Sequence, residues 1–258
     1  MSIGTPVDKM QESITYIYDG GLIGFYCCVY ESIARKQLPH DIFSDKEEQL
    51  SLLSTERIES DVTKAHKLRE YIKSKISTQG LRLIENVFLS CMKHKEMAML
   101  QFILKGLKEG EKVLTKLADP VVANLIEAER HLLGERHLLL GFVRFSDYQG
   151  VLVSTISPKN FILPFIAGHF VCRFRNEDFI IFDKTHKAAL IYKDGKKQII
   201  PVEDFELAEV TEDEENYRTL WKQFYNTVAI KNRYNPKLRM NNVPKRYWEN
   251  MVELKDLL

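Results

Sequence analysis

The sequence predicts an α+β fold in which a mainly helical part, residues 1–136, precedes an antiparallel β-meander with flanking C-terminal helices, residues 137–258. Before residue 137, apolar side chains recur at spacings of three and four residues, as they do along the buried face of a helix. After it, short runs rich in β-branched and aromatic residues are separated by turn signals, which is typical of antiparallel strands. Hydrophobic residues form 45% of the chain, which is ample for a core, so we expect the helical part to pack on the meander in one compact unit.

The helical part is expected to open with a short strand and an aromatic helix. Residues 14–18 predict the strand and residues 22–35 the helix, with a turn at the Asp-Gly-Gly of residues 19–21. Residues 38–55 show little periodicity and predict a loop. Four further helices follow, and the last begins at Asp119-Pro120, an N-cap with a proline in the first helical position. Their apolar stripes are Leu68, Tyr71, Ile72 and Ile76; Leu81, Ile84, Phe88 and Cys91; Met97, Leu100, Leu104 and Leu107; and Val122, Leu125, Ile126, Leu132 and Leu133.

The second part is expected to contain strands and one helix. Residues 138–148 and 151–156 predict two strands joined by a turn at Gln149-Gly150, and residues 160–173 predict the helix. Three more strands form the meander, in which Asp194-Gly195 is a strong signal for a two-residue hairpin turn. These three strands are residues 179–183, 188–192 and 197–202.

The C-terminal region combines an acidic stretch, an amphipathic helix and a basic segment. Residues 203–215 contain no Lys or Arg, and within them Thr211 and Glu214 have the spacing of a capping box. The helix that follows has one apolar face, and a short helix is expected after Pro244. The residues of that face are Tyr217, Leu220, Trp221, Phe224, Tyr225 and Val228.

Several classes of protein are disfavoured by what the sequence lacks. It has no phosphate-binding loop, dinucleotide-binding glycine motif, zinc-hydrolase or deaminase motif, or nucleophile elbow. The cysteines have neither zinc-site spacing nor the CxxxCxxC cluster of radical SAM enzymes, so no metal or other cofactor is expected. We expect all four to be buried small hydrophobic residues: Cys27, Cys28, Cys91 and Cys172.

The expected location is the cytoplasm. The N-terminus has no basic region followed by an apolar run, and no stretch reaches the roughly 18 apolar residues of a membrane span. Unpaired cysteines fit a reducing compartment, and no membrane partner is expected. The net charge of +1 argues neither for nor against a nucleic-acid partner, so local charge must decide that question.

Candidate catalytic residues are few, and the sequence alone does not establish a catalytic activity. His137 ends an acidic and basic stretch, and His169 lies among apolar residues, where a hydrogen-bonded structural role is the simpler interpretation. Asp183 ends a predicted strand, a position where carboxylates often act, although residues 183–185 also fit a plain turn. In an enzyme, these three side chains would converge with Arg144 in one cleft.

The glycine turn near the N-terminus allows a further interpretation. Residues 18–24 (YDGGLIG) resemble a strand, glycine turn and helix, an arrangement in which backbone amides can approach a phosphate. Such turns are also common for purely steric reasons. The motif alone therefore does not predict a phosphate site.

Positive charge is concentrated in residues 230–248, which contain Lys and Arg but no acid. Basic groups neutralise phosphates, aromatic faces stack on bases, and amides hold the backbone or read base edges. Tyr247 and Trp248 would either stack on bases, which requires an exposed ring face, or pack the last helix. Alternatively, the basic segment pairs with the acidic residues 203–215, as the near-zero net charge allows. The candidate nucleic-acid-binding residues are Arg144, Arg173, Arg233, Asn235, Lys237, Arg239, Arg246 and Tyr247.

Five motifs, in order and with matching spacing, resemble a known family over nearly the whole chain. They are IYDGGLIGFYCCVYESIARKQLP, HLLLGFVRF, LPFIAGHFVCRF, FIIFD and IKNRYNPKLRMNNVPKRYWENM. The chain is similar to a family of DNA-repair or DNA-metabolism proteins that are encoded beside a radical SAM enzyme. In some members this domain is fused to a uracil-DNA glycosylase domain, which is not present in this sequence. The resemblance carries no catalytic residues over to this chain.

The resemblance implies an accessory protein that binds DNA and works with a separate radical SAM enzyme of DNA repair or modification. Two alternatives stay open. One is an enzyme acting on damaged nucleic acid through the cleft described above. The other is a scaffold without DNA contact, which predicts an exposed apolar patch on residues 1–135 and basic side chains paired with residues 203–215.

Overall fold

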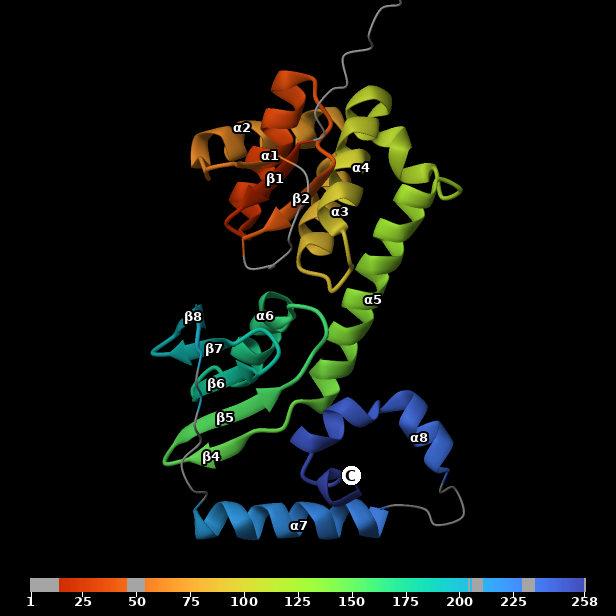
Figure 1. Cartoon of the computed structure of the whole chain (residues 1–258). Coiled ribbons are helices and arrows are strands. Elements are labelled where there is room, and N and C mark those ends of the chain that lie inside the picture. The colour runs from red at the N-terminus through yellow and green to blue at the C-terminus, as the bar shows by residue number, and fades with distance from the viewer. Residues whose placement is uncertain (1–13, 46–53, 204, 206–210, 229–234, 258) are drawn as a thin grey trace, which may run out of the picture. The chain divides into compact units, whose positions relative to one another are not determined.

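The computed structural model divides the chain into two compact units (Figure 1). The first unit consists of residues 1–88 and 92–129, and the second of residues 89–91 and 130–258. Helix α5 (Pro120–Phe142) begins in the first unit and ends in the second, and the expected division at residue 136 lies in the same helix. The structure describes residues 14–45, 54–203, 205, 211–228 and 235–257.

The first unit contains a small parallel sheet. Strand β1 (Thr15–Tyr18) lies between β2 (Asp41–Ser44) and β3 (Thr55–Arg57), and both neighbours run parallel to it. The first strand was predicted, but the expectation of a continuous loop over residues 38–55 is wrong. Strands of four and three residues are too short for an alternating pattern, and their pairing depends on β1, which is distant in the sequence.

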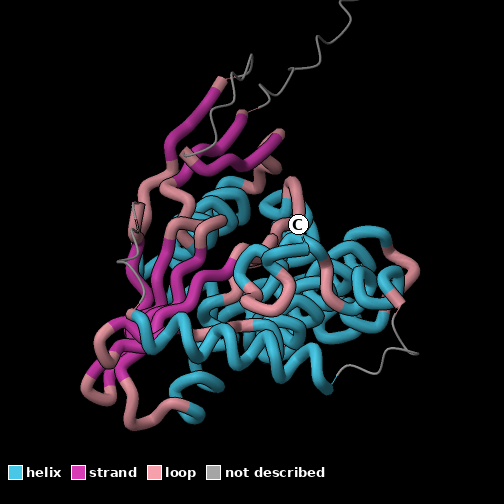
Figure 2. Tube along the Cα trace, turned by 90° about the horizontal axis from the view of Figure 1, so that it is seen from below, coloured by secondary structure: helices cyan, strands magenta, loops and turns pink. Residues whose placement is uncertain are grey.

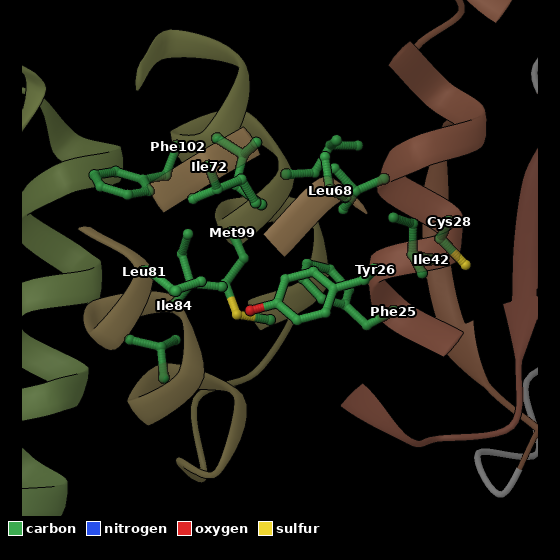
Figure 3. Packing of buried hydrophobic residues seen from close by; sticks show 14 of the residues in the cluster. Phe25, Tyr26, Cys28, Ile42, Leu68, Ile72, Leu81, Ile84, Met99 and Phe102 are labelled. Atoms are coloured by element: carbon green, nitrogen blue, oxygen red, sulfur yellow. The ribbon is translucent and has the colours of Figure 1, made fainter. Parts of the chain in front are cut away.

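Helices pack against this sheet and form the core of the first unit together with it. Helix α1 (Leu22–Arg35) has the predicted bounds. The other helices, predicted by their apolar stripes, are α2 (Val62–Lys75), α3 (Thr78–Phe88), α4 (Lys95–Glu109) and the first half of α5, with a 3-10 turn η1 (Gly110–Thr115) after α4. Figure 3 shows how side chains from α1, β2, α2, α3 and α4 meet, among them Phe25, Ile42, Leu68, Ile84, Met99 and Phe102.

The second unit is built on a five-stranded mixed sheet in the order β4-β5-β6-β7-β8 (Figures 1 and 2). The strands are β4 (Ser146–Tyr148), β5 (Val151–Ile156), β6 (Asp178–Asp183), β7 (Ala188–Lys193) and β8 (Lys196–Pro201). The antiparallel meander of the last three strands is confirmed. However, β5 and β6 are parallel and are joined by the crossover helix α6 (Leu163–Arg173), which packs near β7 and β8.

The start of the second part differs from the prediction. Residues 138–142 are the last turn of α5, so only residues 146–148 of the expected strand pair with β5. The alternating pattern of residues 142–145, which suggested a strand, lies where the helix ends. The leucines before it, residues 138–140, continue the apolar stripe of α5. The predicted turns at Gln149-Gly150 and Asp194-Gly195 both form. In the second, φ is positive at Asp194 (50°) and Gly195 (74°), which is the conformation that such two-residue turns require.

The C-terminal elements are helices α7 (Glu212–Val228) and α8 (Pro236–Asn242) and the 3-10 turns η3 (Lys245–Asn250) and η4 (Lys255–Leu257). The amide of Glu214 donates to Oγ1 of Thr211 over 3.3 Å, which is half of the predicted capping box. The carboxylate of Glu214 instead accepts from the Asp147 amide at 3.1 Å, and this contact fastens α7 beside β4.

The burial of the four cysteines was predicted correctly for only two of them. Cys27 and Cys28 are buried as expected, whereas Cys91 and Cys172 are exposed free thiols, so the prediction was wrong for that pair. Within the described part of the chain, none of the helices combines the length and the apolar character that crossing a membrane requires.

Candidate functional site at the carboxyl end of the parallel strand pair

The carboxyl ends of β5 and β6 lie side by side, because Ile156 pairs with Asp183. The chain leaves β5 here through residues 157–162 and enters α6. In sheets with parallel strands, ligand sites form in the crevice outside the carboxyl ends. We therefore take this edge of the second unit as the candidate site, and Asp183 is the predicted residue that lies in it.

Asp183 forms a carboxylate–imidazole pair with His186. Its side chain is fully buried, and Oδ2 lies 2.7 Å from Nδ1 of His186. Its Oδ1 accepts the backbone amides of Thr185 (3.0 Å) and His186 (3.2 Å), which makes the turn that the sequence suggested. The imidazole is 27% exposed and lies against the Phe161 ring. In the neutral tautomer whose Nδ1–H donates a hydrogen bond to Asp183, Nε2 is the ring nitrogen that accepts a proton, which is the arrangement of an oriented general base.

A second carboxylate, Glu135 of α5, lies on the other side of the segment that follows β5. Its side chain is 1% exposed and accepts the backbone amides of Lys159 (2.9 Å) and Asn160 (2.8 Å). It also accepts the side-chain amide of Asn160 (2.6 Å), a guanidinium N–H of Arg246 (2.8 Å) and the Tyr247 hydroxyl (2.7 Å). One carboxylate thus holds together α5, the segment after β5, and η3.

The electrostatics of this cluster favour a charged glutamate. Burial raises the pKa of Glu135, but the hydrogen bonds from Lys159, Tyr247 and Asn160 outweigh it, and the pKa lies below its ordinary value. The pKa of Tyr247 is raised by burial and by the neighbouring carboxylate, so the phenol stays protonated and donates. We interpret Glu135 as an ionised structural anchor.

Asn160 completes the network and is fully buried. Its amide nitrogen lies 3.2 Å from Nδ1 of His131, and its amide oxygen accepts the backbone N–H of Cys91 at 2.9 Å. The amide of Phe161 donates to the carbonyl of Leu89 at 2.9 Å. The short segment 89–91 is therefore fixed against this edge of the second unit.

Two predicted phosphate contacts, Arg144 and Arg246, are engaged in ion pairs with buried carboxylates. Arg144 lies 2.8 Å from Glu253, and Arg246 lies 2.8 Å from Glu135. Burial raises the pKa of Glu253, but the hydrogen bonds from Arg144, Trp221 and the backbone, together with the positive charge of Arg144, outweigh it, and the pKa lies below its ordinary value. Neither partner belongs to the acidic residues 203–215, so the pairing proposed as the alternative does not involve these two arginines in the described part of the chain.

The aromatic residues of the basic segment pack inward. Tyr247 and Trp248 are 2% and 5% exposed, so neither offers the ring face that base stacking requires. The Trp248 indole donates to the carbonyl of Val243 at 2.8 Å, and the cationic groups of Arg239 and Lys245 lie 5.9 and 5.8 Å from its ring centroid. The packing alternative is thus the one that the structure supports.

Two other members of the predicted set lie on α8 or just before it. Asn235 is the N-cap of α8, where its side-chain oxygen accepts the Leu238 amide at 3.0 Å. Lys237 is exposed on the same helix. Arg233, also predicted, lies outside the described residues.

The remaining candidates are dispersed. His137 is exposed on α5, and His169 is exposed on α6 with its ring edge-on to Phe170. Arg173 is exposed at the end of α6, which returns the chain to the amino end of β6, so it lies at the opposite end of the sheet from Asp183. The side chain that lies beside Asp183 is His186. The expected neighbours were His137, His169 and Arg144. Across the described residues, no three His, Cys, Asp or Glu side chains are grouped as a metal site would need.

The glycine turn of the first unit is already occupied by a carboxylate. Oδ1 of Asp19 accepts the Gly21 amide at 2.9 Å, and the Ser60 hydroxyl donates to Oδ2 at 2.6 Å. A Cβ on Gly24 would clash with that Oδ1, so only glycine at this position leaves room for the carboxylate. The carboxylate would repel a phosphate at the start of α1, which disfavours the phosphate interpretation.

Comparison with protein-family models places these residues in a known domain. The DUF4130 model, a domain of unknown function, matches residues 93–253, which is more than half of the chain. The chain belongs to the DUF4130 family. A comparison with curated proteins finds no match. The DUF4130 span includes Glu135, Asn160, Asp183 and His186, so the whole candidate site lies within the family's domain.

Three residues of this DUF4130 site were missed from the sequence. Glu135 stands three residues after Leu132 and four before Leu139, on the buried stripe of α5. This helical spacing could have indicated from the sequence that the glutamate is buried. His186 follows Asp183 by three residues, which is within reach in a turn. Asn160 carried no signal, because its neighbours come from α5 and from residues 89–91.

Proposed function

We propose that this protein is a cytoplasmic DNA-binding accessory of a DNA-repair or modification system and works with a separate radical SAM enzyme. The observation that carries the proposal is a set of three cationic side chains on a firmly anchored C-terminal segment. We call Lys237, Arg239 and Lys245 the α8–η3 cation face. The link to a radical SAM enzyme rests on the resemblance of the sequence motifs.

The anchoring of η3 supports this assignment. Glu135 binds Arg246 and Tyr247, and the Trp248 indole is bonded to Val243, so the segment is held from inside the second unit. Lys237 and Lys245 are exposed, and Arg239 is partly buried. Cations on an ordered backbone lose less conformational freedom when they contact phosphates than cations on a loose tail. The buried aromatic residues thus position the cations instead of contacting bases.

The proposal predicts DNA binding that depends steeply on salt. Fluorescence anisotropy with labelled single-stranded and duplex DNA, measured over a salt series, gives the number of phosphates contacted from the slope of log K against log salt. Replacing Lys237, Arg239 and Lys245 by alanine is expected to reduce that slope by about three units on duplex DNA, with a uniform loss of affinity across sequences.

A matched control separates the cation face from general charge. Lys67, Lys73 and Lys112 are exposed on the first unit, and their triple alanine variant removes the same charge. It should bind DNA as the wild type does. Equal losses in both variants, or no binding of the wild type at low salt, would contradict the proposal and favour the scaffold alternative.

A second candidate function is supported by the Asp183–His186 pair. We propose as the alternative an enzyme acting on damaged nucleic acid, with His186 as general base and Asp183 holding its orientation. The supporting observation is the buried carboxylate, 2.7 Å from a partly exposed imidazole, at the carboxyl end of parallel strands.

This alternative is tested by turnover of oligonucleotides that carry damaged bases. A general base contributes about 10²- to 10⁴-fold to a rate, so His186→Gln should lower turnover by at least about 100-fold. His169→Gln, which changes an exposed histidine on α6, should leave it unchanged. Turnover that is insensitive to His186→Gln, or that is absent on every substrate, would exclude this role.

A further inference from the structure

Helix α7 has an apolar face that the described residues of the second unit leave largely uncovered. Five large apolar side chains, spaced by three and four residues, are exposed along it, and Tyr217 is 69% exposed. We call this set the α7 stripe: Tyr217, Leu220, Trp221, Phe224 and Val228. Figures 1 and 2 show α7 running along the outer side of the second unit, beyond β4. Contiguous apolar patches of this kind mark interaction surfaces.

The adjacent face of α7 attaches the helix to its own unit through mostly polar contacts. Arg218 donates to the Ser146 hydroxyl at 2.7 Å, and Lys222 pairs with Asp256 at 2.6 Å. The Trp221 indole donates to Glu253 at 3.0 Å, and the Arg144 guanidinium lies 5.7 Å from its ring centroid, so Trp221 is only 40% exposed and belongs to both faces. The helix is therefore held in place with its stripe facing outward.

The charges along α7 are unequally divided. The first turn, residues 212–215, consists of acids, whereas residues 219–228 contain Lys222 and no acid. A parallel pair of such helices would bring the two acidic ends together. An antiparallel pair places the acidic end of each helix against the acid-free end of the other. The net negative charge of α7 also disfavours nucleic acid as the ligand of the stripe.

We propose that the α7 stripe binds the α7 stripe of a second copy of this chain in an antiparallel, two-fold symmetric pair. The two-fold axis passes between Leu220 and Trp221, so that Tyr217 of one copy faces Phe224 of the other. Covering the stripes would remove about 1,000 Å² in total from water, which is at the lower limit for a specific interface. The dimer is accordingly weak and forms in the micromolar range.

Sedimentation equilibrium of the full-length protein across the micromolar range tests the pairing. The wild type should show a monomer–dimer equilibrium, and Phe224→Glu should raise the dissociation constant by at least about tenfold. Asn226→Glu introduces the same charge on the opposite side of α7 and should dimerise like the wild type. A wild type that is monomeric at every concentration, or variants that dimerise equally, would overturn the proposal.

Cross-linking tests the antiparallel orientation independently. The background carries Cys91→Ser and Cys172→Ser, which remove the exposed thiols, and a short bismaleimide joins cysteines that face each other. Leu220→Cys lies beside the two-fold axis and should give a cross-linked dimer. Val228→Cys should not, because an antiparallel pair places Asp213 opposite it. Efficient cross-linking of Val228→Cys would exclude this orientation, and no cross-linking of Leu220→Cys would exclude the pair.

Discussion

Replacing Glu135 by glutamine should lower the free energy of unfolding of the second unit by about 3 kcal/mol at neutral pH, because it leaves a partly buried arginine without its counter-charge. The carboxylate accepts from Arg246, Tyr247, Asn160 and the Lys159 amide, and a glutamine oxygen can satisfy only part of that set. Its amide hydrogens would also face donors. Glutamine keeps the volume of the side chain, so the loss reports charge and hydrogen bonding and not a cavity.

The loss should depend on pH with a defined sign. The pKa of Glu135 in the folded protein lies below the ordinary glutamate value of 4.5, so the folded state binds its proton less readily than the unfolded state. The stabilisation is therefore fully present above pH 4.5 and disappears as the pH falls through the lower folded pKa. The difference between wild type and Glu135→Gln should shrink over that acid range.

Tryptophan fluorescence during urea unfolding provides the measurement. Both tryptophans, Trp221 and Trp248, belong to the second unit, so the signal reports that unit alone. Glu249→Gln is the control, since its ion pair with Lys184 is solvent-exposed and should contribute less than about 1 kcal/mol. Equal effects of the two substitutions, or a difference that persists unchanged at low pH, would show that Glu135 is not the anchor.

Local signals in the sequence were enough for much of the fold. The helix at residues 22–35 lies between a glycine turn and a polar loop, and its bounds follow from these neighbours. The Asp194-Gly195 turn specifies its hairpin through the positive φ that both residues adopt. The parallel strands β2 and β3 depend instead on β1, and the parallel pairing of β5 with β6 depends on the crossover through α6. Pairings across such separations leave no local pattern.

The candidate site was harder to predict from the sequence, because its residues also meet across long separations in the chain. Asp183 could be found because it ends a strand. The cleft expected from His137, His169, Asp183 and Arg144 is not the group that forms, because the imidazole beside Asp183 is that of His186. Residues 230–248 were identified as basic, but the charge pattern could not separate cations that face solvent from Arg246, which is bound to a glutamate more than 100 residues earlier. The burial of Trp248 likewise depends on packing that only the folded chain defines.

Replacing Trp248 by alanine should destabilise the second unit by about 4 kcal/mol, because truncation of a buried tryptophan loses its transfer free energy and leaves a cavity. The indole is 5% exposed, and it also donates to the Val243 carbonyl that ends α8. Hydrogen exchange of the β6 and β7 amides measures this loss without relying on fluorescence from the deleted residue. Tyr217→Ala, which removes an exposed aromatic side chain, should change stability by less than about 0.5 kcal/mol.

Trp248→Leu then distinguishes an anchoring role from a stacking role in DNA binding. Leucine fills much of the same space but has no aromatic face, so it should retain the position of Lys245 and Arg239 and bind DNA within a few-fold of the wild type. If the ring instead stacked on a base, its loss would cost about 1–3 kcal/mol of binding free energy, or roughly 5- to 150-fold in affinity. Because Arg239 and Lys245 both lie over this ring, a loss of that size with unchanged hydrogen exchange would mean that DNA displaces them and opens the segment. An unchanged affinity would leave the cations as the contacts and the tryptophan as their support.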